Sequence, residues 1–217
     1  MKHIIDSENT VILSTATFPP VEYVACMLKY NPVWLEGDEN FNKQSYRNRY
    51  IINSANGPLN QVIPVKRKHN QKTKIQRVGV DYSLNWPEQF WRAIYAAYNN
   101  SPFFLFYQDD LRAFFQRRFD TLWALNRESL NLVMDWAGLD KSLFVTGDFK
   151  KDYEKTIDLR YKIHPKHSPV IKLEPWTQVF DEKYGFNPKV SVLDLLFNKG
   201  PESLIYLKNI ANQDIQS

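Results

Sequence analysis

Short apolar runs and a helical repeat alternate near the start of the chain. Residues 10–15 form a β-branched apolar run, which is typical of a strand buried on both faces. Pro19-Pro20 can begin a helix, and Asn31-Pro32 can end it. The apolar residues between them follow helical spacing at Val21, Val24, Ala25 and Leu28. Residues 33–36 read as a second strand, so a parallel strand–helix–strand unit with a right-handed crossover is predicted.

Three further strands are predicted in the next part of the chain, at residues 50–53, 61–65 and 76–80. The turn signal Asn56-Gly57-Pro58 and a polar stretch at residues 69–72 separate them. Pro64 has no backbone N–H to donate to a ladder, so its strand is expected at a sheet edge or with a bulge.

From Asn85 onward the apolar positions keep a helical repeat over three successive segments. The first helix starts at Asn85, which forms a capping arrangement with Glu88. The second starts at Ser101-Pro102, and the third covers residues 120–137 and ends at Gly138 as a C-cap. The apolar stripes contain Trp86, Phe90, Trp91, Ile94, Tyr95 and Tyr98, then Phe104, Tyr107, Leu111 and Phe115, then Leu122, Leu125, Leu132, Val133 and Trp136. Such stripes indicate a hydrophobic core rather than a cofactor pocket.

The last third of the chain first loses and then regains its periodicity. Residues 148–188 are polar and dotted with proline, which predicts a long ordered loop with a short strand near residues 178–180. Ser191 and Asp194 then form a capping box, and Pro201 follows Gly200 to begin a final helix.

Together these patterns predict one α/β domain over residues 1–217. Residues 1–82 hold a parallel or mixed sheet that starts with the strand–helix–strand unit. Residues 83–217 form a mainly helical part with an irregular region at residues 148–190.

Charge is distributed unevenly along this pattern. The formal net charge is only +4, yet residues 40–80 contain no Asp or Glu. The basic residues of this segment are Lys43, Arg47, Arg49, Lys66, Arg67, Lys68, Lys72, Lys74 and Arg77. Such a segment either attracts an anionic partner or forms a solvated face of hairpins and loops.

Several functional classes are disfavoured by what the sequence lacks. There is no apolar run of membrane-spanning length and no secretory signal pattern, so a cytoplasmic protein is expected. Cys26 is the one cysteine, and no Gly-rich phosphate loop, GxSxG or HExxH motif occurs. A metal site at His164 and His167 is disfavoured by the neighbouring proline and lysine. No cofactor is indicated, and no nucleic-acid module accompanies the basic segment, so nucleic acid is an unlikely partner.

Several sequence blocks, taken in order, resemble the WbqC-like protein family. These blocks are FPPVEYVACM, FNKQSYRNRYII, GPLNQVIPVKR, NWPEQFWRAIYAAYNNSPFFLFY and GFNPKVSVLDLLFNKGPESLIYL. The resemblance covers nearly the whole chain, and its most specific parts are KxSxxNR and SVLDLLFNxGP. Members of that family typically carry a Gln-Pro pair after the first strand. This chain has Ala16-Thr17 before Phe18-Pro19-Pro20 instead.

The resemblance implies a cytosolic bacterial protein of surface-polysaccharide biosynthesis, such as that of O-antigen. One activity that it implies is transfer of an acyl or aminoacyl group to a nucleotide-linked or lipid-linked amino sugar. The alternative is a non-catalytic accessory protein that recognises an anionic ligand of the same kind. The altered turn and the lack of an obvious nucleophile favour the alternative.

The candidate site residues come mainly from segments that follow the first two predicted strands. Ligands of open α/β sheets bind beyond the carboxyl ends of the strands, which is where these segments lie. The candidates for binding an anionic nucleotide-sugar or phosphate-linked sugar are Pro20, Tyr23, Lys43, Ser45, Asn48, Arg49 and Lys66. Arg160 and Gln178 match positions associated with relatives of the family. Asp194 is the candidate catalytic base, with Asn198 one helical turn later as a further binding residue.

Overall fold

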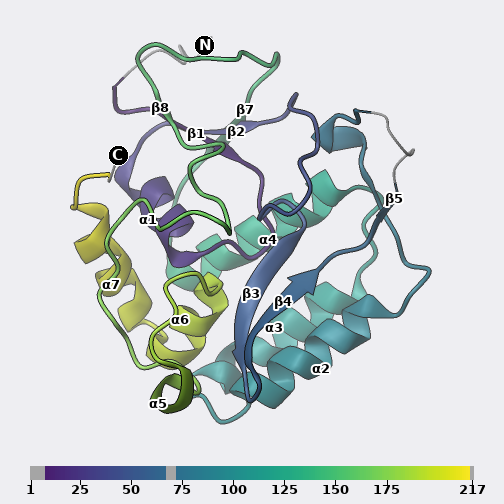
Figure 1. Ribbon diagram of the computed structural model, residues 1–217, viewed down its shortest axis with the longest axis vertical. Helices are drawn as coiled ribbons and strands as arrows, with labels where there is room; N and C mark the ends of the chain where they lie inside the picture. Colours follow the sequence, from purple (N-terminus) through teal and green to yellow (C-terminus); the bar gives the residue numbers. More distant parts are fainter. Residues whose placement is uncertain (1–7, 67–71, 216–217) are drawn as a thin grey trace.

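A four-stranded parallel sheet forms one end of the molecule in the computed structural model, which describes residues 8–66 and 72–215 (Figure 1). Its strands are β1 (Val11–Ser14), β2 (Val33–Glu36), β7 (Leu143–Val145) and β8 (Ile157–Asp158), in the order β7-β2-β1-β8. All neighbours are parallel, and Val11 pairs with Val33 on one side and Ile157 on the other. Helix α1 (Val21–Lys29) joins β1 to β2, so the predicted parallel strand–helix–strand unit is confirmed.

Strands β1 and β2 are buried on both faces, which explains their continuous apolar sequences. Val11 and Leu13 point into the main hydrophobic core. Ile12 and Trp34 lie on the opposite face and pack with Tyr153 from the irregular region. The sheet is therefore covered by a long loop on one side and by the rest of the core on the other.

The segment after β2 contains two antiparallel pairs. Strands β3 (Arg49–Ser54) and β4 (Gly57–Val62) form a hairpin, and β5 (Val65–Lys66) pairs with β6 (Gly79–Val80). The predicted strand at 61–65 was wrong as one element, because Pro64 interrupts the ladder between β4 and β5. The predicted strand at 76–80 is a 3₁₀ turn (Ile75–Arg77) followed by the short β6. Arg67 and Lys68 lie outside the described residues.

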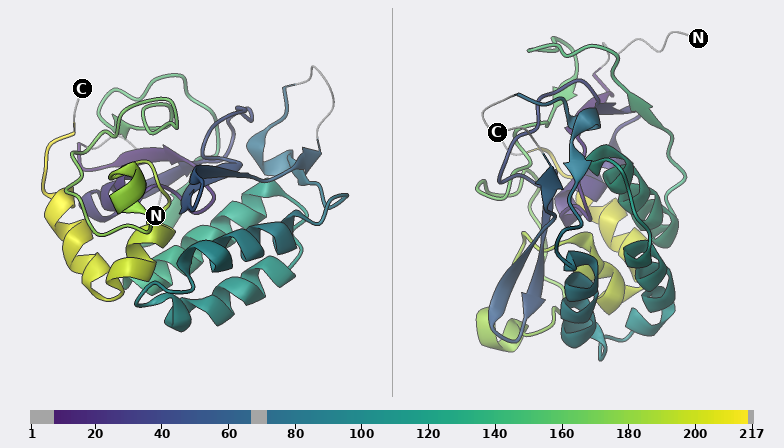
Figure 2. Two further views of the ribbon diagram at one scale, coloured as in Figure 1. Left: turned by 60° about the horizontal axis from the view of Figure 1, so that its bottom comes forward. Right: turned by 90° about the vertical axis from the view of Figure 1, so that its right-hand side faces the viewer.

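The other half of the molecule is mainly helical, as predicted. Its helices are α2 (Trp86–Tyr98), α3 (Phe104–Gln116), α4 (Leu122–Ala137), α5 (Asp181–Tyr184), α6 (Val192–Lys199) and α7 (Glu202–Ala211). Figure 2 shows strands and helices in two layers, with α2 against β3, and α7 packed beside α1. Gly138 ends α4 with a φ of 65°, which confirms the predicted C-cap. Within the described part of the chain, no helix combines the length and the apolar character needed to cross a membrane.

Two predicted helix caps are corrected by the structure. The Asn85 side chain makes no capping hydrogen bond, and Glu88 instead binds Arg92 and Arg112. Ser191 does cap α6 by accepting the backbone N–H of Leu193. Asp194 does not complete the box, because the Ser191 N–H donates to the Ile51 carbonyl and leaves no capping role for the carboxylate.

The irregular region also differs from its prediction. Residues 178–180 form no strand; they lead into the short helix α5. The strands that this region and its approach do contain, β7 and β8, are three and two residues long and pair with the sheet begun by β1 and β2. Strands this short carry too little periodicity to be recognised locally.

Candidate functional site

Each strand of the parallel sheet delivers a polar side chain at or just beyond its carboxyl end. These residues are Ser14 at the end of β1, Glu36 at the end of β2, Thr146 after β7, and Asp158 with Arg160 around the end of β8. We call this group, together with Glu39 and Arg47, the edge network. Polar groups meet here because parallel strands end at the same side of a sheet, where α/β proteins usually bind ligands.

Arg160 is the buried centre of one half of the edge network. Its guanidinium binds Glu36 at 2.9 Å and Asp158 at 2.6 Å, and donates to the carbonyls of Lys150 and Lys151. Burial lowers the Arg160 pKa, but the hydrogen bond and charge of Asp158 and the charge of Glu36 outweigh it and raise the pKa. Arg160 therefore remains charged, and its donors are occupied by protein groups.

Arg47 is the buried centre of the other half. Its Nε donates to Glu39 Oε1 at 2.8 Å, and a terminal nitrogen binds Glu39 Oε2 at 2.5 Å and also contacts Ser14 Oγ. Ser14 Oγ donates to the Arg160 carbonyl at 2.9 Å, which links the two halves. Burial raises the Glu39 pKa, and the hydrogen bond and charge of Arg47 oppose that shift.

The turn after β1 lies directly against the basic segment that follows β2. The Thr17 N–H donates to the Tyr46 carbonyl at 3.0 Å, and Thr17 Oγ1 contacts the Arg47 carbonyl. Asn126 on α4 also donates to that carbonyl, at 2.8 Å. Phe18 in this turn has a φ of 38°, a strained value for a bulky side chain. The turn and the basic segment are thus held together by the surrounding structure.

A small cavity lies between this turn and the segment after β8. We call it the edge cavity; Thr15, Tyr23 and Tyr46 line it with Arg47 and Arg160. The volume that the centre of a water-sized sphere can occupy is about 10 Å³, so the cavity holds about one water molecule. Tyr23 is anchored beside it by donating to the Ser14 carbonyl at 2.8 Å. A larger ligand would therefore lie above the edge cavity and not inside it.

Three polar atoms in the cavity-lining turn and the basic segment are buried without a hydrogen-bond partner in the described residues. They are Thr15 Oγ1, Asn48 Oδ1 and Arg49 Nε. Asn48 uses its amide nitrogen to donate to the Ile63 carbonyl at 3.0 Å, which leaves only its oxygen unpaired. Buried polar atoms normally have a partner, so unpaired ones indicate where water or a ligand binds. Of the three, only Thr15 lines the edge cavity itself.

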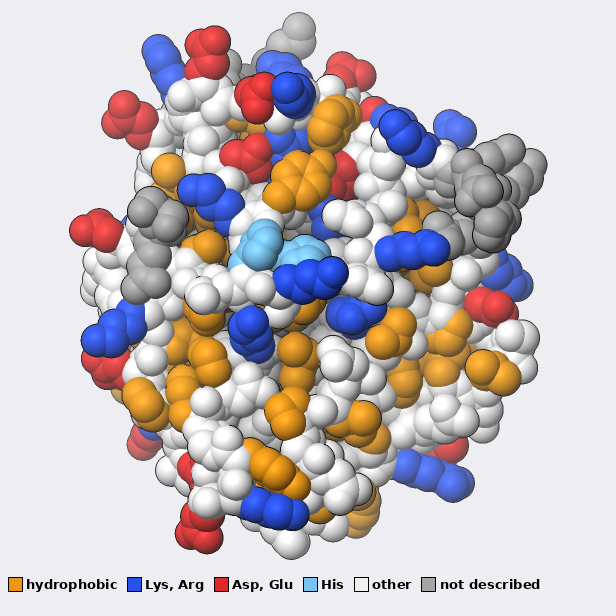
Figure 3. Space-filling model, in the orientation of Figure 1, with side chains coloured by type: hydrophobic (Ala, Val, Ile, Leu, Met, Phe, Trp, Pro, Cys, Tyr) orange, Lys and Arg blue, Asp and Glu red, His pale blue; other side chains and the backbone are white. Residues whose placement is uncertain are grey.

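Positive charge gathers on the surface next to this cavity. Burial lowers the His164 pKa, and the nearby charges of His167, Arg47, Lys166 and Arg49 lower it further. Lys189 joins the group by donating to the Pro165 carbonyl at 3.1 Å. Figure 3 shows the two described histidines, in pale blue, with Lys and Arg side chains around them. Among these residues only Arg47 has a described ion pair, so the surface, which we call the cationic face, is poorly neutralised.

A buried carboxyl group that the sequence reasoning missed lies below the cationic face. Glu22 is in the first turn of α1, and its Oε2 accepts the Val170 N–H at 2.6 Å. Burial raises the Glu22 pKa to about 7, against the lowering effects of Val170 and Lys189. Its charge also acts on Tyr46, which lines the edge cavity. The available signal was an acidic residue among apolar residues at the start of a helix.

The other predicted binding residues of the N-terminal half lie at different places in the structure. Pro20 is buried and bridges to Ser191. Ser45 Oγ donates to the Asn42 carbonyl at 2.7 Å and shapes the turn that carries the cations. Lys43 is exposed on this turn. Lys66 is exposed on β5, in a different sheet from the edge network.

Asp194 lies in a separate polar cluster inside the helical core. Its carboxylate accepts the Tyr98 hydroxyl at 2.9 Å and the Trp176 indole N–H at 2.8 Å, and its side chain is fully buried. Asn198 donates to the Asp194 backbone carbonyl at 2.8 Å. Burial raises the Asp194 pKa to about 7, although hydrogen bonds from Trp176 and Tyr98 oppose this. We call these residues, with Asn53 and Gln178, the Asp194 cluster.

Gln178 belongs to this cluster as a link between loops. Its side chain accepts from Asn53 Nδ2 at 3.3 Å and from the Asn187 N–H at 2.8 Å, and donates to the Asn187 carbonyl at 3.0 Å. The structure therefore brings Tyr23 and Arg160 to the edge cavity, and Arg49 to the histidines of the cationic face. Asn48 bonds to Ile63, and Asp194, Asn198 and Gln178 lie elsewhere.

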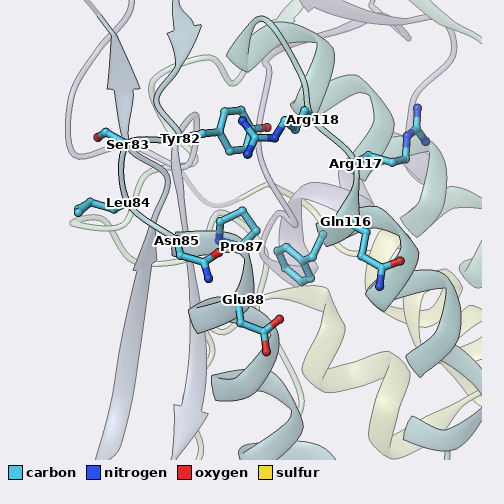
Figure 4. Close-up of a pocket in the computed structure, with 10 residues that line it drawn as sticks. Tyr82, Ser83, Leu84, Asn85, Pro87, Glu88, Gln116, Arg117 and Arg118 are labelled. Carbon is cyan, nitrogen blue, oxygen red and sulfur yellow. The ribbon is translucent and has the colours of Figure 1, made fainter.

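A larger groove lies between the start of α2 and the end of α3 (Figure 4). Its volume is about 390 Å³ on the same measure, but its charged groups already have partners. Arg117 pairs with Glu128, Glu88 with two arginines, and Arg118 covers the Tyr82 ring at 5.1 Å. We therefore favour the smaller edge cavity and the cationic face as the candidate site.

These features define an α/β protein whose parallel sheet ends in a buried ion network beside a cationic surface. The chain belongs to the WbqC-like protein family, whose model matches residues 15–168. That range includes every residue of the edge network except Ser14, together with the basic segment and both histidines of the cationic face. The chain is 27% identical over 197 residues to "Uncharacterized protein Rv1507c" of Mycobacterium tuberculosis, covering 79% of this chain and 85% of that protein. No solved structure matches the chain.

Proposed function

We propose that this protein binds an anionic, phosphate-bearing small molecule of the nucleotide-sugar or phosphate-linked sugar type at the cationic face. The proposed setting is bacterial surface-polysaccharide biosynthesis in the cytoplasm. The observation that carries this proposal is Arg49, whose Nε is buried without a partner among the described residues and whose charge acts on His164 in the cationic face. A guanidinium in this condition is suited to a phosphate, which it can bind through two parallel hydrogen bonds.

The charge balance supports the same ligand class. Arg49, His164, Lys166, His167 and Lys189 bring cationic or protonatable groups close together, and none has an ion pair among the residues described. Mutual repulsion makes such a group of charges unfavourable in the free protein. An anion placed between them removes this repulsion and gains several favourable contacts at once.

A second candidate function is group transfer, and Glu22 is the observation that favours it. A carboxyl group with a pKa of about 7 can accept and return a proton near neutral pH. In an acyl or aminoacyl transfer, the amine nitrogen of the sugar would attack the acyl carbon, and the bond between acyl group and carrier would break. The amine proton would pass to Glu22. Asp194 is a less suitable base, because both of its oxygens accept hydrogen bonds inside the core.

Isothermal titration with inorganic pyrophosphate and with uridine diphosphate glucose tests the binding proposal. We expect both to bind the wild-type protein at low salt, and the affinity to fall as salt increases. Arg49→Ala should lower the affinity about tenfold or more. Arg92→Ala is the matched control, because Arg92 is exposed on α2 and paired with Glu88. Absence of binding, or unchanged binding in Arg49→Ala, would contradict the proposal.

Mass spectrometry of product mixtures separates binding from group transfer. The protein would be incubated with an acyl or aminoacyl donor and an amino-sugar nucleotide that stabilises it in a thermal-shift assay. Product formation that is lost in Glu22→Gln, with ligand binding retained, would establish the transferase. Binding without any product would favour the accessory role.

A further inference from the structure

The two histidines of the cationic face differ in the hydrogen bonds of their ring nitrogens. His164 Nδ1 accepts the backbone N–H of Lys166 at 3.2 Å. His167 Nδ1 contacts the backbone carbonyl of Lys162 at 3.2 Å, a position that requires a hydrogen on that nitrogen. The ring centroids are 5.1 Å apart. Both Nδ1 atoms are thus occupied by the backbone of the same loop, and only the Nε2 atoms remain for a ligand.

These contacts determine the tautomer of each neutral ring. A neutral imidazole carries one hydrogen, and the nitrogen that accepts a hydrogen bond cannot carry it. Neutral His164 therefore carries its hydrogen on Nε2 and is a donor there. Neutral His167 carries its hydrogen on Nδ1, so its Nε2 is an acceptor. The pair offers one donor and one acceptor on neighbouring rings.

The surroundings of His164 favour the neutral form in the free protein. The ring is partly buried, and His167, Arg47, Lys166 and Arg49 all lower its pKa. Protonation would also place a hydrogen on Nδ1 opposite the Lys166 N–H, which would break that hydrogen bond. His164 can therefore donate to an anion through Nε2 without first taking up a proton.

We propose that His164 donates to the phosphate of the bound molecule through Nε2, and that His167 accepts a hydrogen bond at Nε2 from a hydroxyl or amino group of the same molecule. The inference rests on the proposed function and narrows its ligand to a sugar phosphate with a free hydroxyl or amino group close to the phosphate. A simple anion would use His164 and the arginines but would leave His167 without a role.

The proposal is tested with two probes that share a phosphate, methyl phosphate and glucosamine 1-phosphate, titrated at pH 8.5. At this pH the His164 ring is neutral, because its surroundings lower a pKa whose ordinary value is already well below 8.5. We expect wild-type protein to prefer glucosamine 1-phosphate. His164→Ala should lower the affinity for both probes by a similar factor, about five- to tenfold. His164→Gln retains a hydrogen-bond donor and should keep part of the affinity. His167→Ala should remove the preference and leave methyl phosphate unchanged.

Nuclear magnetic resonance of the wild-type rings gives a second readout that does not depend on the folding of any variant. Long-range ¹H–¹⁵N spectra at pH 8.5 should show His164 with its hydrogen on Nε2 and His167 with its hydrogen on Nδ1. The opposite tautomers would overturn the proposal. Loss of probe binding when a zinc chelator is added would also overturn it, because the histidines would then hold a metal ion and not the probe directly. If the probes bind in an Arg49-dependent way but both histidine variants behave like wild type, this inference fails and the proposed function stands. If neither probe binds, both fail.

Discussion

The edge network and the Asp194 cluster are both buried and polar, but they satisfy their charges differently. The edge network pairs two arginines with three carboxylates, so its charges largely cancel within the protein. The Asp194 cluster contains one carboxylate, held by a tyrosine and a tryptophan, with no cation bonded to it in the described structure. Arg47 opposes the rise that burial causes in the pKa of Glu39, whereas no cation opposes the rise in the pKa of Asp194, which reaches about 7.

This difference separates a structural role from a functional one. All donors of the Arg160 guanidinium bind protein groups, and Arg47 binds Glu39 through two of its nitrogens, so both support the site and have few donors left for a ligand. Arg49 is only partly buried and lacks such a partner among the residues described. A side chain left unsatisfied by its own fold contributes little to stability and is available for binding.

The largest expected effect is on stability, from Arg160→Met. The substitution leaves Glu36, which is fully buried, without its cation. We expect the free energy of unfolding, measured in urea, to fall by about 3–5 kcal/mol. Arg92→Met on the exposed face of α2 is the control and should have little effect. A loss below about 1 kcal/mol in Arg160→Met would show that the edge network is not what holds this end of the sheet.

Next in size is the pH dependence that Asp194 contributes. Its folded pKa of about 7 lies above the ordinary value of 3.8, so the folded protein keeps a proton that the unfolded chain has already released between these pH values. The free energy of unfolding should therefore fall as pH rises from about 4 to 7. The Asp194→Asn variant has no carboxyl group to titrate at this position. Its free energy of unfolding relative to wild type should therefore increase with pH over that window, by on the order of 1.4 kcal/mol per pH unit.

Urea unfolding at several pH values checks this, with Asp135→Asn on the exposed side of α4 as the control. Glu22 has a similarly raised pKa of about 7 and should add a slope in the same window, which Glu22→Gln removes. If the difference in unfolding free energy between Asp194→Asn and wild type stays constant over this pH range, Asp194 remains charged and the prediction is contradicted.

A moderate effect is expected for Tyr98→Phe. The Tyr98 hydroxyl accepts the Asn53 N–H at 3.2 Å and donates to Asp194, so its loss leaves two buried groups unpaired. We expect a cost of about 1–3 kcal/mol in unfolding free energy. Tyr95→Phe, on an exposed position of the same helix, is the matched control. Equal stabilities of the two variants would contradict the importance of this hydrogen-bond chain.

The smallest effect on stability is expected for Arg49 in the cationic face and for Lys43 on the exposed turn before it. Arg49→Ala and Lys43→Ala should each change the free energy of unfolding by no more than about 0.5 kcal/mol, because neither residue has an ion pair among the described residues. The same Arg49 variant should show the large loss of pyrophosphate affinity predicted above. A strongly destabilised Arg49→Ala would place Arg49 with Arg160 as a structural residue.

The elements that could be predicted from the sequence are those with enough local periodicity. Strands β1 and β2, helix α1 and the long helices α2 to α4 were confirmed, because each buries an apolar run or stripe within its own length. Strands β7 and β8 could not be predicted, since they are held by pairing with strands more than a hundred residues earlier.

The roles of site residues followed the same division. The sequence indicated that cations after β2 meet the turn after β1, and the two segments are in contact. The KxSxxNR block singled out Arg49 as a binding candidate, but nothing local showed that Arg47, two positions earlier, is paired with Glu39. Glu22 was also missed, because nothing local shows that its first helical turn is buried beside Lys189.

By itself, the sequence determined the α/β class, the order of its main elements and the segment where positive charge is concentrated, because these depend on residues close together in the chain. Only the tertiary structure decided which charges are neutralised and which carboxyl groups have raised pKa values. Those properties depend on burial and on partners brought from distant segments: Glu39 reaches Arg47, no described carboxylate reaches Arg49, and the helical core encloses Asp194.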